Sequence, residues 1–84
     1  MFRAKIIVTL RPSILDPQGS VITRALNTME LEVQHVRAGK FFDVSFLAKD
    51  EVEAQAKVVS MCEKLLINMI TEDYAVLELT RVEG

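Results

Sequence analysis

The chain has 84 residues, half of them hydrophobic, with ten Lys and Arg against twelve Asp and Glu. This length predicts one domain over residues 1–84, and the apolar content excludes a disordered chain. The net charge of -2, the pI near 5.3 and the scattered cations disfavour nucleic acid as a partner. No apolar run is long enough to cross a membrane, and the N-terminus alternates rather than forming a signal peptide. We therefore expect a soluble, cytoplasmic protein without membrane partners.

The single cysteine and the single histidine give no sign of a reactive centre. Cys62 lies in a helical apolar pattern, which predicts a small buried hydrophobe. His35 has no Cys, Ser or second His at a useful spacing, so we interpret it as a surface or strand residue. We also find no catalytic triad, paired carboxylates, metal-ligand spacing or phosphate loop. The sequence predicts no catalytic residue, no metal and no cofactor.

The first predicted strand and helix cover the N-terminal third of the chain. Residues Phe2–Leu10 alternate at period two, which predicts a strand that Pro12 ends. A helix from Pro17 to about Met29 follows, with Asp16 as its N-cap and proline at its first position. Its predicted core residues are Val21, Ile22, Ala25, Leu26 and Met29.

Gly19 stands in the first turn of this helix, where glycine costs about 1 kcal/mol relative to alanine. The cost has two explanations that the sequence leaves open. Either another segment approaches the backbone closely there, or the helix end frays.

A hairpin is predicted in the middle of the chain. Val33–Ala38 forms a short strand, and a tight turn at Ala38–Gly39 leads into a strand over 40–49. We interpret this last strand as an inner strand of the sheet. Its core-facing residues are Phe42, Val44, Phe46 and Ala48. Its other face carries Phe41, Asp43, Ser45 and Leu47, so this face is expected to meet something else.

The C-terminal third predicts a second helix and a last strand. The helix runs from about Glu51 to Ile67, with Asp50 as its N-cap and Glu53 placed to complete a capping box. The strand covers Tyr74–Val82. Both of its faces are substantially apolar, so the pattern leaves open which face looks inward.

The resulting order is β-α-β-β-α-β, which predicts an α+β, ferredoxin-like fold. Right-handed crossovers would place two helices on one face of a four-stranded antiparallel sheet. The opposite face would then carry an apolar patch of Ile7, Phe41 and Leu47. A patch of this kind marks an interface, and we expect it to form a homodimer.

Four segments together resemble the PurS family, the small subunit of phosphoribosylformylglycinamidine (FGAM) synthase. They are Leu15-Asp16-Pro17-Gln18-Gly19, Val36-Arg37-Ala38-Gly39-Lys40, Cys62-Glu63-Lys64-Leu65-Leu66 and Glu72-Asp73-Tyr74. The resemblance spans essentially the whole chain. Two positions depart from the family pattern: Met29-Glu30 replaces a Leu-Gly pair, and Met69 replaces a proline. These departures concern the end of the first helix and the stiffness of the last loop.

The resemblance implies a non-catalytic subunit of an ATP- and glutamine-dependent ligase in purine biosynthesis. PurS-like chains form homodimers or tetramers, assemble with a PurL synthetase and a PurQ glutaminase, and support ammonia transfer between the two. Three exposed segments, residues 11–19, 37–40 and 71–74, are candidates for contacts with these partners. The residues concerned are Arg11, Asp16, Pro17, Gln18, Gly19, Arg37, Lys40 and Tyr74. Structural roles compete at the same places: helix capping by Asp16 and Pro17, a turn at Gly39, and solvated charges at Glu72 and Asp73.

Two other functions use the same fold. A dimeric regulatory domain that binds a small molecule would need a polar or glycine-rich cleft, for which Gln18-Gly19 offers little. An RNA-binding module would need aromatic residues on the open sheet face and basic edges. Phe41 and Tyr74 are the only aromatic candidates for that face, and the acidic pI disfavours this function.

Overall fold

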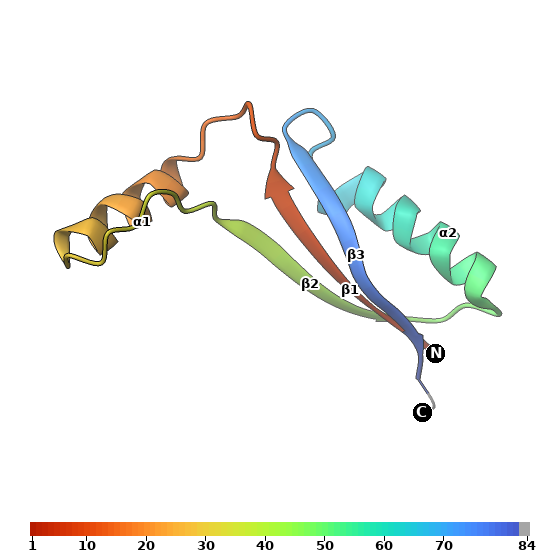
Figure 1. The fold of residues 1–84 in the computed structure, drawn as a ribbon. Helices are drawn as coiled ribbons and strands as arrows, with labels where there is room; N and C mark the ends of the chain where they lie inside the picture. Colours follow the sequence, from red (N-terminus) through yellow and green to blue (C-terminus); the bar gives the residue numbers. More distant parts are fainter. Residues whose placement is uncertain (83–84) are drawn as a thin grey trace.

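A computed structural model of the chain describes residues 1–82. It shows a three-stranded antiparallel sheet with one helix against it and a second helix projecting from one end (Figure 1). The elements are β1 (Phe2–Leu10), α1 (Pro17–Thr28), β2 (Gly39–Phe46), α2 (Glu51–Met61), a π-helical turn η1 (Cys62–Leu66) and β3 (Glu72–Arg81). The α+β class is therefore confirmed.

The strand order is β2-β1-β3, and both neighbours run antiparallel to β1. The four-stranded sheet predicted from the sequence is wrong, because residues 33–38 form no strand. The prediction that β2 is an inner strand is also wrong, since β1 takes the central place and β2 lies at an edge.

The hydrophobic core lies between α2 and one face of the sheet. In β1 the alternating residues Phe2, Ala4, Ile6 and Val8 are all buried. Helix α2 and the turn after it contribute Ala54, Val58 and Cys62, and Phe42 and Phe46 of β2 pack against this cluster. Burial raises the pKa of the Cys62 thiol. The prediction that Cys62 is a small buried hydrophobe is confirmed.

A β-bulge in β3 explains why its faces were ambiguous. Lys5 pairs with Glu78 while the next residue, Ile6, pairs with Val76, so Leu77 is an extra residue in the ladder. The core-facing positions of β3 are therefore Tyr74 and Val76 before the bulge, and Leu79 and Arg81 after it. An alternation that changes phase within the strand cannot be assigned to one face by period-two reasoning.

Both helices begin where the sequence predicts. The Asp16 carboxylate accepts from the Gly19 N–H at 2.9 Å, and Asp50 accepts from the Glu53 N–H at 2.8 Å. Pro17 occupies the first position of α1, where its missing N–H leaves no bond unmade. The second helical stretch ends as the π-helical turn η1, one residue short of the predicted end.

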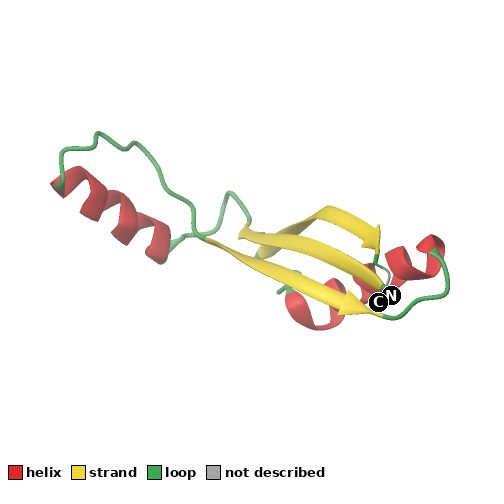
Figure 2. Cartoon of the chain, turned by 90° about the horizontal axis from the view of Figure 1, so that it is seen from below, coloured by secondary structure: helices red, strands yellow, loops and turns green. Residues whose placement is uncertain are grey.

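The position of α1 differs from the prediction. Helix α1 does not lie over the sheet beside α2 but extends away from its end (Figures 1 and 2). All residues of α1 are described, and Gly19 alone among them is buried. Val21 and Met29, predicted as core, are 60% and 66% exposed. The prediction of two helices on one face is therefore wrong for a single chain, which gives α1 no sheet to cover.

The predicted hairpin turn at Gly39 is also wrong. Residues 31–38 are irregular and lead directly into β2, and Gly39 does not have a positive φ. Glycine is needed here for a different reason: a Cβ at Gly39 would lie 2.6 Å from the carbonyl oxygen of Val8. The close approach of β1, rather than a turn, therefore excludes a side chain.

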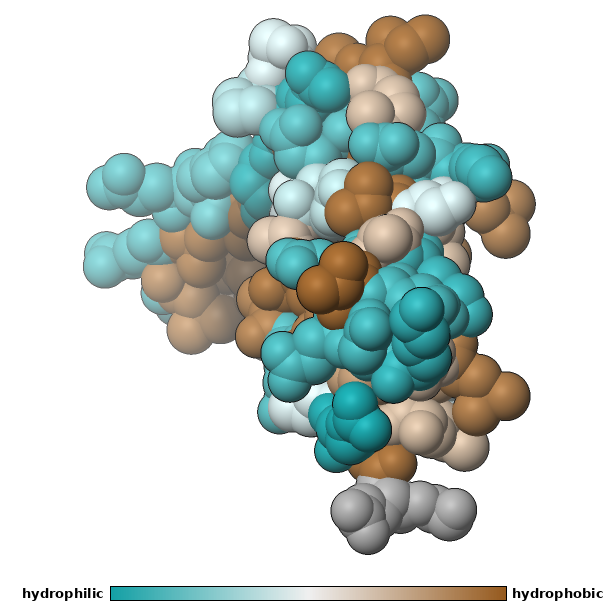
Figure 3. All heavy atoms as spheres, turned by 90° about the vertical axis from the view of Figure 1, so that its right-hand side faces the viewer, coloured by the Kyte–Doolittle hydropathy of each residue, from teal (hydrophilic) through white to brown (hydrophobic). Residues whose placement is uncertain are grey.

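The molecule is long and thin, with extents of 51 × 28 × 14 Å and a radius of gyration of 16.3 Å. A compact domain of this length would have a radius of gyration near ~12 Å. Apolar side chains interrupt the polar surface seen from the α2 side (Figure 3). Within residues 1–82, neither helix has the length and apolar character needed to span a bilayer.

Candidate partner-binding surfaces

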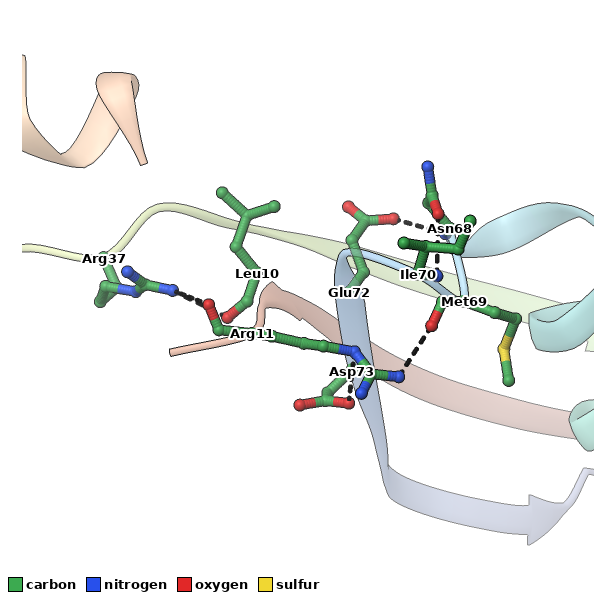
Figure 4. A network of polar contacts seen from close by, with 8 residues as sticks. All are labelled: Leu10, Arg11, Arg37, Asn68, Met69, Ile70, Glu72 and Asp73. Carbon is green, nitrogen blue, oxygen red and sulfur yellow. Dashed lines mark hydrogen bonds and ion pairs between the residues drawn. The ribbon is translucent and has the colours of Figure 1, made fainter. Parts of the chain in front are cut away.

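The three segments predicted to contact partners meet at one end of the sheet. We call this region the loop junction and define it as residues 10–16, 37–40 and 68–73. Here β1 ends, the chain enters β2, and β3 begins (Figure 4). The junction is held together by arginine and carboxylate side chains that bond to backbone groups, and by ion pairs between side chains.

Arg37 connects the second segment of the junction to the first. Its Nη2 donates to the carbonyl oxygens of Leu10 at 2.9 Å and Arg11 at 2.8 Å (Figure 4). Its Nη1 donates to the carbonyl oxygen of Ile14 at 3.4 Å. One planar guanidinium thus satisfies three carbonyl groups of an irregular loop, which a lysine cannot do with the same geometry.

Arg11 connects the first segment to the third. Its Nη2 donates to the Met69 carbonyl oxygen at 2.7 Å, and its backbone N–H donates to the Thr71 carbonyl oxygen at 2.8 Å. Its Nε is buried and lies 3.6 Å from Asp73 Oδ1, an ion pair beyond hydrogen-bond length. Arg11 therefore fixes the loop before β3 against the end of β1.

The Glu72 carboxylate holds the loop before β3 through two contacts. Its Oε1 accepts from the Asn68 backbone N–H at 2.7 Å, and its Oε2 lies 3.2 Å from Lys40 Nζ. The Asn68 N–H and then Lys40 lower the pKa of the Glu72 carboxyl group. The carboxylate is therefore ionised at neutral pH and ties the start of β3 to the start of β2.

Asp16 holds α1 to the segment that precedes β2. Besides capping Gly19, it accepts from the Ala38 N–H at 2.8 Å through Oδ2. These two backbone donors lower the pKa of the Asp16 carboxyl group. A Cβ at Gly19 would lie 2.2 Å from the Val36 carbonyl oxygen, so another segment does approach this glycine closely. Of the two explanations for Gly19, the close approach is confirmed.

Several hollows lie at the junction, including one of about 470 Å³ lined by Thr9, Leu10, Pro12, His35, Arg37 and Asp73. A groove of about 650 Å³ runs between α1 and residues 34–37, and its polar lining includes Ser13, Thr23, Arg24 and His35. A smaller cavity of about 190 Å³ is lined in part by Gln18, Lys40 and Glu72. Within the described residues, no three His, Cys, Asp or Glu side chains gather closely enough to hold a metal ion.

The predicted partner-binding residues thus fall into two groups. Arg11, Asp16, Gln18, Arg37 and Lys40 come together around the junction and its cavities. Gly19 is buried against Val36, while Pro17 is exposed beside it at the helix start. Tyr74 lies elsewhere: it pairs with Val8 on the α2 side, and burial raises the pKa of its hydroxyl.

Sequence reasoning missed Asn68, Glu72 and Asp73 as members of this network. The sequence leaves Glu72 and Asp73 open between partner contacts and solvated charges, and it gives no sign of the bonds that Asn68 makes. Lys40, the partner of Glu72, and Arg11, the partner of Asp73, are more than 30 positions away in the chain, so no local pattern signals these two ion pairs.

The open face of the sheet, opposite α2, is the second candidate surface. Ile7 pairs with Phe41 on one side and with Ala75 on the other, so the three form an apolar row across the sheet. Phe41 is 56% exposed. Leu47 lies just past the other end of β2, and the Arg3–Asp43 ion pair separates it from this row. The structure therefore brings Ile7 and Phe41 together but not Leu47.

The fold and these two surfaces define a class: a small α+β protein whose polar network fixes loops and whose apolar residues lie exposed for association. Comparison with known proteins narrows the class. The family model of PurS, described as phosphoribosylformylglycinamidine (FGAM) synthase, matches residues 3–79.

Individual proteins show the same similarity. The PurS subunit of this synthase from Bacillus subtilis is 44% identical over 75 residues, which is 88% of each chain. The structure of PurS from Thermus thermophilus matches with a TM-score of 0.86 at 33% identity, over 98% of each chain. A chain of PurLQS from Thermotoga maritima matches with a TM-score of 0.79 at 30% identity, over 98% of this chain and 99% of that one.

The chain therefore belongs to the PurS family, as its sequence resemblance indicated. Its function is that of a PurS subunit of FGAM synthase in purine biosynthesis.

Proposed function

We propose that the chain is a non-catalytic, self-associating subunit that bridges the PurL synthetase and the PurQ glutaminase and supports ammonia transfer between them. The observation that carries this proposal is the likeness, over nearly its whole length, to a chain of the Thermotoga maritima PurLQS structure. An assembly role of this kind needs exposed contact surfaces on the subunit.

The loop junction is the proposed contact site for the larger subunits. Its backbone is fixed by Arg11 and Arg37, so its exposed groups keep one geometry before a partner arrives. A fixed surface loses less conformational entropy on binding than a mobile loop does. Pro17 and Gln18 at the start of α1, together with Lys40, are the accessible residues that we expect to contact a partner. The cytoplasmic location expected from the sequence stays a prediction.

The open face is the proposed site of self-association. The row of Ile7, Phe41 and Ala75 is apolar, while the Arg3–Asp43 and Lys5–Glu78 ion pairs lie beside it on the same face. An apolar centre with a polar rim is the usual arrangement of a protein interface. Leu47 stays a predicted interface residue at the far end of the strand.

The assembly role is tested by reconstitution. Purified PurL and PurQ subunits from the same source are assayed for glutamine-dependent FGAM formation with and without this chain. We expect turnover to require the chain, and Lys40→Glu to reduce glutamine-dependent turnover more than ammonia-dependent turnover. Glutamine-dependent turnover that is equal with and without the chain would contradict the proposal.

The open-face interface is tested by Phe41→Asp, because a buried unpaired carboxylate opposes association. Light scattering should show a lower mass for Phe41→Asp than for the wild-type protein at the same concentration. Ser45→Asp is the matched control, since it adds the same charge on the same face of β2 away from the apolar row. An unchanged mass for Phe41→Asp would remove Phe41 from the interface.

A further inference from the structure

We propose that the outer edge of β3, with the apolar cavity between β3 and α2, binds an extended segment of one of the two larger synthase subunits. The segment would add a strand to the sheet, and it would carry apolar side chains accompanied by Lys or Arg. We call this surface the β3 edge and define it as residues 74–81 together with residues 55–59 of α2. The inference rests on the bridging function proposed above, which needs a second contact surface besides the loop junction.

The backbone of β3 lacks a neighbouring strand along its outer side. Within residues 1–82 the strand order β2-β1-β3 leaves β3 at an edge, paired only with β1. At one end the Val82 N–H donates to the Met1 carbonyl oxygen at 2.7 Å. At the other end the Arg11 N–H donates to the Thr71 carbonyl oxygen at 2.8 Å. Because the bonding direction alternates along an antiparallel strand, these two bonds and the register identify the residues whose backbone groups point outward. They are Tyr74, Val76, Leu79 and Arg81.

A cavity of about 290 Å³ lies beside this edge, between β3 and α2 (Figure 1). Its apolar lining residues are Val58, Val59, Tyr74, Val76, Leu77 and Leu79. Val76 and Leu77 are 41% and 60% exposed. Since side chains alternate between the two faces of a strand, those of an added strand on the α2 side would enter this cavity and cover both residues.

The bulge at Leu77 disfavours a second copy as the occupant of the edge. It shifts the outward backbone groups from positions 74 and 76 to positions 79 and 81. A bulge is one of the devices by which an edge strand avoids pairing with its own copy. A partner strand has to match this change of phase, which makes the edge selective for one partner.

The charge of the β3 edge indicates a basic partner. Asp73 and Glu78 of β3 form ion pairs, yet their side chains stay 57% and 46% exposed, and Glu78 lines the cavity. Glu63 contributes, after burial and Cys62, to the raised pKa of the Tyr74 hydroxyl, so Glu63 also lies near the cavity. Two copies related by a twofold axis would place these carboxylates against one another, whereas Lys or Arg side chains would complement them.

The cations of the same two elements are engaged elsewhere. β3 has one cation, Arg81, whose guanidinium lies 4.9 Å from the centroid of the Phe2 ring. α2 also has one, Lys57, whose Nζ donates to the Leu47 carbonyl oxygen at 2.7 Å. These contacts leave the carboxylates beside the cavity available to a basic segment.

The β3 edge is tested by Leu77→Lys, which adds a positive charge where a basic segment would bind. Leu77 is exposed, so this change leaves the core intact. Binding of the immobilised chain to a mixture of purified PurL and PurQ subunits is measured by surface plasmon resonance. We expect the variant to bind at least about tenfold more weakly than the wild type. Val52→Lys is the matched control and should bind like the wild type, because it adds the same charge at a 79% exposed valine of α2 outside the cavity.

The possible results separate this inference from the bridging function. Equal binding by Leu77→Lys and the wild type would overturn the β3 edge as a contact surface and leave the bridging function intact. A wild-type chain that binds neither larger subunit would overturn both.

The added strand is tested by residue-resolved hydrogen exchange of the wild-type chain, alone and in complex with both subunits. The outward amides of Tyr74, Val76, Leu79 and Arg81 should gain at least about tenfold protection in the complex. The amide of Ala75, which faces β1, is the internal control and should not change. A complex in which the outward amides gain no protection would refute strand addition. Outward amides that are already protected in the chain alone would show that a second copy occupies the edge, and would refute the proposed occupant.

Discussion

Single residues in this protein connect segments that are far apart in the sequence. Asp16 shows this most clearly, because one carboxylate caps α1 and also holds the segment entering β2. Its capping role could be predicted, since Asp before Pro at a helix start is a local pattern. Its second bond, to Ala38, could not be predicted because 22 positions separate the partners.

The double role of Asp16 predicts a pH-dependent loss of stability. The pKa values of Asp16, Asp43 and Glu72 are all lowered in the folded state, so their ionised forms stabilise the fold above about pH 4. This stability is lost as the pH falls through the lowered folded-state pKa values. At pH 7, Asp16→Ala should lower the Tm by roughly 5 °C through loss of the cap.

The difference in Tm between wild type and Asp16→Ala should shrink below about pH 4, because protonated Asp16 no longer accepts as a carboxylate. Thermal unfolding followed by circular dichroism between pH 7 and pH 2.5 measures this convergence. Glu63→Ala, at an exposed position of η1, is the control and should not show it. A Tm difference that stays constant down to pH 2.5 would contradict the assigned role of Asp16.

At the scale of elements, local patterns predicted what depends on local physics. β1, both helix starts and the core face of β2 follow from alternation and capping, and the structure confirms them. The face of β3 could not be assigned because the bulge at Leu77 changes the phase of its alternation. The Val33–Ala38 strand failed for another reason: within residues 1–82, no strand pairs with its backbone.

The packing of α1 against residues 33–38 predicts the effect of a second substitution. Gly→Ala within a helix ordinarily stabilises by about 1 kcal/mol. Gly19→Ala should instead destabilise by roughly 1–3 kcal/mol, because its Cβ would lie 2.2 Å from the Val36 carbonyl oxygen. Ser20→Ala, the exposed neighbour in the same turn, is the matched control and should be neutral. Urea unfolding measures both free energies, and a Gly19→Ala variant as stable as wild type would show that this contact is not tight.

At the scale of the whole molecule, the sequence predicted the α+β class but not the number of strands or the position of α1. Within residues 1–82, the predicted fourth strand does not form, and α1 does not cover the sheet. The period of the apolar residues and the helix-capping patterns indicate what kind of element a segment can pair with. They do not say whether the partner segment belongs to the same chain or to another.

This distinction predicts a concentration-dependent stability. If α1 and the segment 33–38 are covered only in a dimer, unfolding also dissociates the two copies, and the Tm must rise with protein concentration. A tenfold increase in concentration adds about 1.4 kcal/mol per dimer, which corresponds to roughly 4 °C for two chains of this length. Differential scanning calorimetry over a hundredfold range of concentration measures this slope. An equal Tm at all concentrations in the wild-type protein would mean that the core of β1, β2, β3 and α2 is stable without a second copy.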